Sequence, residues 1–186
     1  MKVLGIDPDT GTTAWALVST DALHACGLVI SNRGIWGHAR VADQHRALIR
    51  EICTAGTPLR QAIEAADKIV VEGQHFKNKK VNPDNIVKVA HITGGIEALC
   101  RWIRPEDVET LDPTIWTDGF AKEARMARIP RLLNTTYEAI AEMAGCSLTD
   151  ANHIVDAAGQ GRYYAKNSGK TSFQFRQGTR RRRRRR

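Results

Sequence analysis

The sequence predicts an α/β fold, in which a mixed β-sheet is flanked by α-helices. Short apolar runs bounded by turn residues are typical of strands, and three of them occupy the first 30 residues. Longer segments with helical spacing of apolar residues follow, and a β-branched run at 68–72 separates two of them. Strands that come first and then alternate with helices form a mixed sheet with helices on its faces.

The elements follow from this spacing in chain order. The predicted strands are 2–6, 13–18, 26–30, 68–72 and 108–111, the first three as an antiparallel meander. The predicted helices are 43–53, 59–66, 84–104, 131–144 and 150–164. Pro58 interrupts the first pair of helices, and Asp112-Pro113 stops the last strand. Ser147 and Asp150 form a capping box that predicts where the last helix begins.

The domain organisation is simple. At 186 residues the chain is long enough to bury a core and fits one domain, expected at 1–165, followed by a polar, Arg-rich tail at 166–186. The formal net charge is +8, but Arg180 to Arg186 supply seven of the 28 basic residues, which leaves 21 basic against 20 acidic residues elsewhere. The run of arginines adds salt-sensitive attraction to phosphates or is an appendage without a role.

Cysteine spacing and hydropathy exclude two classes of protein. Cys26, Cys53, Cys100 and Cys146 lie far apart without the spacing of zinc ligands, so we expect reduced thiols. No apolar run approaches the roughly 20 residues that span a bilayer, and no basic leader precedes an apolar stretch. We therefore expect a cytoplasmic protein without membrane contact.

Acidic residues end two of the predicted strands. Asp7 follows Val3 to Ile6 at the start of a turn, and Glu72 ends the run at 68–72 before Gly73. The last helix carries His153 and Asp156, which share one face because they are three residues apart. Three segments thus offer carboxylate and imidazole groups suited to a metal, although each residue alone is often a turn, cap or packing residue.

These segments resemble the RuvC-type Holliday junction resolvases over roughly residues 1–165. The resemblance rests on Gly5-Ile6-Asp7-Pro8, on Val71-Glu72 with Phe76 shortly after it, and on His153-Ile154-Val155-Asp156-Ala157. It implies a ribonuclease H-like fold and a homodimeric endonuclease that resolves four-way DNA junctions by paired symmetric nicks. The chain departs from many members of the family in having Asp9 after Asp-Pro and a His/Asp pair where others have Asp/Asp.

The resemblance also implies a catalytic metal site. Asp7, Glu72, His153 and Asp156 would hold two Mg²⁺ ions, with Asp7 between them, Glu72 on one and Asp156 on the other, while His153 binds the second ion or positions water. Because imidazole is softer than carboxylate, Mn²⁺ is expected to substitute. Asp150 is better explained as a helix N-terminal acid.

Two basic segments are candidate DNA contacts. Phe76 is expected to stack or wedge at the branch, as the corresponding aromatic does in the resembled family, while Lys77, Lys79 and Lys80 neutralise phosphates. The alternative is a solvated loop with Phe76 capping the core. Lys122 and Arg125 belong to a second basic segment that would follow a DNA arm.

The long helix at 84–104 is apolar on more than one side. Such a helix is buried by its own core and by a second partner, which here would be a second copy of the chain. The alternative is a central helix that the monomer encloses completely.

Other functions stay open on the sequence alone. A related nuclease acting on flaps or RNA/DNA hybrids would use the same residues. Gly5 to Thr13 also resembles the phosphate-binding hairpin of sugar kinases and actin-like ATPases, although a second Gly-rich phosphate loop is not apparent. A third alternative is a branched-DNA binding module without catalysis.

Overall fold

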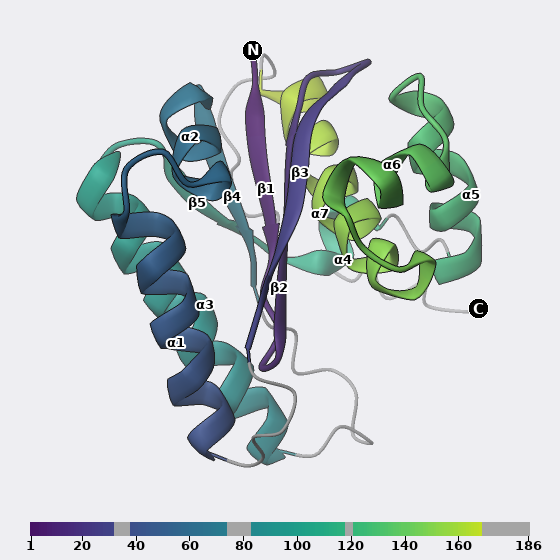
Figure 1. Cartoon of the computed structure of the whole chain (residues 1–186). Coiled ribbons are helices and arrows are strands. Elements are labelled where there is room, and N and C mark those ends of the chain that lie inside the picture. Colours follow the sequence, from purple (N-terminus) through teal and green to yellow (C-terminus); the bar gives the residue numbers. More distant parts are fainter. Residues whose placement is uncertain (32–37, 74–82, 118–120, 169–186) are drawn as a thin grey trace, which may run out of the picture.

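The structure is a computed structural model that describes residues 1–31, 38–73, 83–117 and 121–168. A five-stranded mixed sheet lies at its centre, with strands in the order β3-β2-β1-β4-β5 (Figure 1). The strands are β1 (Val3–Asp7), β2 (Thr12–Val18), β3 (Leu23–Ile30), β4 (Lys68–Glu72) and β5 (Val108–Leu111). All five therefore coincide with predicted strands, to within three residues at either end.

Helices cover both faces of the sheet, so the fold has three layers (Figure 1). One face carries α1 (His38–Cys53), α2 (Pro58–Ala65) and α3 (Pro83–Ile103). The other carries α4 (Pro113–Trp116), α5 (Lys122–Leu132), α6 (Tyr137–Ala144) and α7 (Leu148–Asn167). Among the described residues, no helix combines the length and apolar character needed to cross a bilayer.

Strand register brings the two strand-end acids together. β1 is antiparallel to β2 and parallel to β4, with Ile6 opposite Val71. The next residue on each strand is therefore Asp7 and Glu72, at the same edge of the sheet. Since neighbouring strands lie about 4.8 Å apart, these two carboxylates begin from adjacent backbone positions.

Alternation along β1 assigns its residues to opposite faces. Leu4 and Ile6 are fully buried in the core under α1, α2 and α3. Gly5 faces α7, because a Cβ there would lie 2.0 Å from the backbone oxygen of Ala157. Asp7 is two residues beyond Gly5 and so points to the α7 face.

Small residues allow α7 to lie very close to the sheet. A Cβ on Gly161 would lie 2.9 Å from Val18 Cγ2 and 3.2 Å from the backbone nitrogen of Gly5. The fully buried Gln160 donates from Nε2 to the Ile6 carbonyl oxygen at 2.5 Å, which ties the helix to the residue before Asp7. The helix that carries His153 and Asp156 is thereby held against the strand that carries Asp7.

The helix predicted at 131–144 is wrong, because the chain forms two helices there. α5 ends at Leu132, two residues after Pro130, and Asn134 has a left-handed φ of 51°. α6 then starts anew, since the side chain of Thr136 accepts a hydrogen bond from Ala139 N. α1 also begins at His38, five residues before the predicted start. The predicted Ser147 cap is confirmed, with Ser147 Oγ accepting from Asp150 N.

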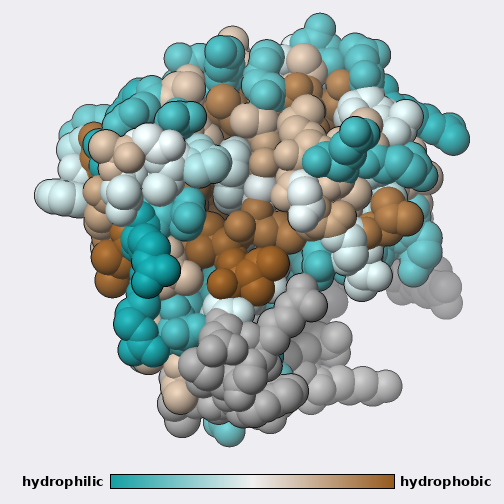
Figure 2. All heavy atoms as spheres, viewed as in Figure 1, coloured by the Kyte–Doolittle hydropathy of each residue, from teal (hydrophilic) through white to brown (hydrophobic). Residues whose placement is uncertain are grey.

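Some apolar side chains remain on the surface. Figure 2 shows apolar groups gathered between the two helical layers, in the region of β3, where Ile30 is 40% exposed. On α3, Ile92 and Ile96 are fully buried, whereas Val87 is 54% and Trp102 72% exposed. This helix is therefore not enclosed by the monomer, and the dimer remains a prediction.

Candidate metal centre

The predicted carboxylates and histidine come together at the edge of the sheet where β1 and β4 end. Asp7 and Glu72 lie side by side on neighbouring strands and face α7. His153 and Asp156 lie in the second and third turns of α7, after its Ser147 cap. Asp7, Glu72 and Asp156 are close enough for their charges to repel one another. Three segments distant in sequence therefore share one negatively charged site.

The hydrogen bond between His153 and Asp7 joins the helix to the strand. His153 Nδ1 lies 3.2 Å from Asp7 Oδ2, and both side chains are partly buried. Burial raises the pKa of Asp7, and the bond to His153 opposes this effect without cancelling it. The same bond raises the pKa of His153 because it stabilises the imidazolium. The pair orients the imidazole so that its other nitrogen, Nε2, is available to a ligand or water.

Glu72 has the most perturbed acidity in the cluster. Burial is the main cause that raises its pKa to about 9, and the charges of Asp7 and Asp156 add to it. Arg125 lowers this pKa, and so does the indole N–H of Trp116. The Trp116 N–H has no acceptor in hydrogen-bonding geometry within the described residues, so its effect on Glu72 is that of a nearby dipole. A carboxyl in this environment is neutral at pH 7 unless a positive charge approaches.

Arg125 brings a positive charge to the α5 side of the site, which lowers the pKa of Glu72 without cancelling the effect of burial. Its Nε lies 3.2 Å from Asp156 Oδ1, and both side chains are largely buried. The guanidinium carbon lies 5.2 Å from the centroid of the Trp116 ring, a distance typical of a cation–π contact. α4 and α5 thus bring an arginine and an aromatic ring to the carboxylates that come from β1, β4 and α7.

The donor set fits hard divalent cations. Carboxylates and imidazoles are ligands that Mg²⁺ and Mn²⁺ sites use. Burial is the main cause of the raised pKa values of Asp7 and Glu72, and repulsion among the carboxylates adds to it, so a cation there would be stabilised by them. Within the described ranges, no three acidic, His or Cys side chains surround a common ion position. Asp7 is bound to His153 and Asp156 to Arg125, so both carboxylates would turn from these partners to bind a cation.

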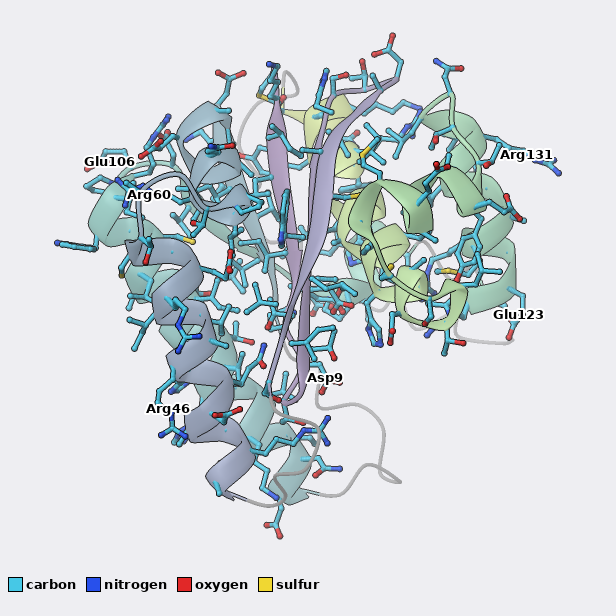
Figure 3. All side chains as sticks on the ribbon, viewed as in Figure 1. Asp9, Arg46, Arg60, Glu106, Glu123 and Arg131 are labelled. Carbon is cyan, nitrogen blue, oxygen red and sulfur yellow. The ribbon has the colours of Figure 1, made fainter. Side chains whose placement is uncertain are left out.

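Two nearby acids have other roles, in keeping with the sequence. Asp9 Oδ1 accepts a hydrogen bond from the backbone nitrogen of Thr10 at 2.6 Å, so it stabilises the turn after β1. Its charge nevertheless raises the pKa of both Asp7 and His153. Asp150 Oδ2 accepts from Ser147 Oγ at 2.8 Å at the start of α7. Figure 3 labels Asp9 near the β1–β2 turn, at the same end of the sheet as the site.

The predicted DNA contacts have different outcomes. Phe76, Lys77, Lys79 and Lys80 lie outside the described residues and stay predictions. Lys122 is exposed in the first turn of α5, in a position to meet a polyanion. Arg125 is turned inward, against Asp156. Neither this ion pair nor Trp116 was predicted from the sequence, because the paired residues are 31 positions apart and no motif contains them.

Comparison with solved structures establishes the fold. The chain is similar to RuvC of Thermus thermophilus, with a TM-score of 0.60 at 17% identity over 91% of this chain and 96% of that one. The chain has the RuvC fold. The T. thermophilus RuvC in complex with a Holliday junction substrate gives a TM-score of 0.58 at 16% identity, covering 91% and 96% of the two chains.

A second resolvase supports the same assignment. The yeast mitochondrial Holliday junction resolvase Ydc2 is similar with a TM-score of 0.53 at 15% identity, over 90% of this chain and 82% of that one. Neither a protein-family model nor a curated protein sequence matches the chain. The RuvC-type fold predicted from three short motifs is therefore confirmed by structure, at identities too low for a sequence comparison to detect.

Proposed function

We propose that the chain is a divalent-metal-dependent endodeoxyribonuclease that resolves four-way DNA junctions by paired symmetric nicks. The observation that carries this proposal is the gathering of Asp7, Glu72, His153 and Asp156 at one edge of the sheet. The similarity of the fold to a RuvC solved with a Holliday junction substrate supports the choice of substrate. The same four residues, in the same order along the chain, carried the resemblance in sequence.

The cations would be two Mg²⁺ ions per site, with Mn²⁺ as a substitute, held by Asp7, Glu72, Asp156 and His153. When bound, they would stabilise negative charge on the attacking and leaving oxygens of the phosphodiester. Before they bind, Glu72 holds its proton at neutral pH, since burial is the main cause that raises its pKa to about 9. Cation binding would therefore release a proton and grow stronger as the pH rises.

The residues around the cluster orient it. His153 is held by Asp7, so the imidazole presents Nε2 to water or to a ligand. Gln160 holds α7 on β1 through a hydrogen bond to the carbonyl of Ile6, which keeps His153 and Asp156 close to Asp7. Arg125 stabilises the charge of Asp156 from the opposite side. Together these contacts hold the side chains of the cluster near one another before a cation binds, and Asp7 and Asp156 would then turn from His153 and Arg125 to ligate it.

Two opposed cuts would require two sites, which a homodimer supplies. A four-way junction has approximate two-fold symmetry, and a symmetric dimer matches it. The exposed Val87 and Trp102 on α3 support this helix as the contact between copies. Sedimentation velocity at micromolar concentration should give a dimer, whereas a monomer at that concentration would exclude this arrangement.

The test is a panel of synthetic four-way junctions, three-way junctions, flaps, RNA/DNA hybrids and linear duplexes incubated with Mg²⁺ or Mn²⁺. We expect paired nicks at symmetric positions of the four-way junction and little cutting of linear duplex. Preferential cutting of flaps or hybrids would assign the site to a related nuclease. Thermal stabilisation by ATP without any cutting would instead favour the nucleotide-binding alternative.

A further inference from the structure

A pocket of about 310 Å³ lies between α4, α5 and α7, beside the carboxylate cluster. Four basic side chains line it: Arg125, Arg128, Arg162 and Lys166. None of the described residues that line it is acidic. Several cations around one cavity repel one another and raise the local potential, so such a cavity attracts an anion.

Arg162 supplies independent evidence that the pocket is suited to an anion. Its Nε is buried and has no hydrogen-bond partner among the described residues. Burial and the neighbouring charge of Arg128 lower the pKa of Arg162, and Asp21 opposes them only in part. A buried guanidinium N–H without an acceptor is unfavourable, and an anion with several oxygens would satisfy it.

The rest of the pocket is suited to more than a bare ion. Its volume lies at the lower end of the range of about 300–1,000 Å³ that is usual for small-molecule sites. The apolar part of the lining includes Ile129, Leu132 and Gly159. A lining that combines basic and apolar groups matches a phosphate with its attached sugar, in which one end is charged and the other is not.

The pocket is continuous with the carboxylates. Arg125 lines it and also pairs with Asp156 at 3.2 Å. Arg162 and Lys166 follow Asp156 on α7 by six and ten residues, which is about 9 and 15 Å along the helix axis. A DNA strand with a phosphodiester at the carboxylates would therefore pass this pocket if it continued along α7.

We propose that the pocket between α4, α5 and α7 is a subsite for a phosphodiester of the DNA strand, next to the bond that is cut. Arg128, Arg162 and Lys166 contact its phosphate oxygens, and Arg125 connects this contact to Asp156. The inference rests on the proposed function, because it assumes that a DNA strand lies with the phosphodiester to be cut at these carboxylates. A free nucleotide has the same chemistry, so the experiment separates the two sources.

Binding is measured without metal, so that no cutting occurs. The probe is the dinucleotide thymidylyl-(3′→5′)-thymidine, titrated by isothermal calorimetry or NMR into wild type, Arg162→Gln and Lys166→Ala. Loss of a charge-assisted hydrogen bond to phosphate should weaken binding about tenfold in Arg162→Gln. Lys166 is exposed, so Lys166→Ala leaves the fold intact and should weaken binding to a smaller extent.

Arg131→Ala is the matched control. Arg131 lies on α5, one turn beyond Arg128, and points away from the body of the protein (Figure 3). This variant removes the same charge as Arg162→Gln from the same basic region, outside the pocket. It should bind the dinucleotide as wild type does, and an equal loss in both variants would overturn the proposal, because general charge attraction would then explain the binding.

Competition identifies the source of the phosphate. Four-way junction DNA should displace the dinucleotide from wild type, which supports a DNA subsite. Thymidine 5′-monophosphate that binds more tightly than the dinucleotide and is not displaced by junction DNA would overturn it. A different result would be a junction that displaces the dinucleotide and yet is not cut by wild type with Mg²⁺ or Mn²⁺. That result would support the pocket and contradict the proposed nuclease activity, so failure of one proposal is distinguishable from failure of the other.

Discussion

The two faces of the sheet differ in how they are packed. The face under α1, α2 and α3 is filled mainly by large aliphatic side chains such as Leu4, Ile63 and Ile96. Two fully buried polar residues on this face, Gln44 and Thr13, hydrogen-bond to each other. The face under α7 is packed by small residues, among them Gly5 and Ala157. The first face supplies most of the buried apolar volume, while the second allows a helix close enough to bring its side chains to Asp7.

Alternate residues of one strand therefore serve stability and chemistry separately. Ile6 and Asp7 are neighbours in β1, yet one is fully buried in the aliphatic core and the other joins the charged cluster. Changes to the aliphatic face should alter the free energy of unfolding and leave the chemistry intact. Changes to the α7 face should do the reverse, or affect both.

The largest effect is expected for Asp7→Asn. Loss of one carboxylate from the cation site should lower the rate of junction cleavage about 10³-fold or more, since several kcal/mol of charge stabilisation are removed. Junction binding and the melting temperature should be retained, because the amide relieves repulsion with Glu72 and Asp156. Single-turnover cleavage and gel-shift assays measure the two quantities.

Asp150→Asn is the matched control for that variant. Asp150 is an acid in the first turn of α7, where it accepts a hydrogen bond from Oγ of the capping Ser147, and it belongs to no proposed ligand set. Cleavage by this variant should stay within a few-fold of wild type. Equal losses in the two variants would indicate a general charge effect instead of a specific site.

On the aliphatic face, Ile63→Ala should lower the free energy of unfolding by about 2–5 kcal/mol. Ile63 of α2 is fully buried, so the shorter side chain would leave a cavity. The cleavage rate per folded molecule should be unchanged, since α2 lies on the face opposite the carboxylates. Urea denaturation followed by circular dichroism gives the first quantity. A strong loss of cleavage in the folded variant would contradict the separation of the two faces.

Gly5→Ala should affect both stability and cleavage. The added methyl group would lie 2.0 Å from the Ala157 oxygen, so α7 must move away from β1. We expect the free energy of unfolding to fall by about 1–3 kcal/mol. Cleavage should also be slower, because His153 and Asp156 move with the helix. Gly94→Ala in α3 is the control: a Cβ there meets nothing within 4 Å, and it should stabilise the protein slightly.

Glu72→Gln should raise stability in a pH-dependent way. The folded protein holds the Glu72 proton up to a pKa of about 9, whereas the unfolded chain loses it near 4.5. The free energy of unfolding of the wild type therefore falls as the pH rises between these two values. Glutamine does not titrate, so the variant does not lose this stability. In EDTA at pH 9 the variant should melt at least about 2–4 °C higher, the shift that corresponds to about 1 kcal/mol, with the difference vanishing near pH 4.5. Parallel melting curves at every pH would contradict the burial of this carboxyl.

The sequence predicted the strands well, because apolar alternation is a local signal, and the strand-end acids that it singled out do lie side by side in the fold. The role of the four clustered residues stays a prediction. The boundary between α5 and α6 was not predicted, since it depends on the left-handed Asn134 and the Thr136 cap inside a helical pattern. The ion pair of Arg125 with Asp156 was missed for a different reason. It depends on how α5 packs against α7, and only the folded chain brings those two positions together.

The account is tested most directly by Mn²⁺ binding to wild type and to Asp7→Asn, Glu72→Gln, His153→Ala and Asp156→Asn, measured by electron paramagnetic resonance at pH 7.5. If the four side chains form one cation site, each variant should bind Mn²⁺ more weakly than wild type does, and Asp7→Asn should lose the most affinity. Binding that is the same in wild type and in all four variants would contradict the site and the nuclease assignment built on it.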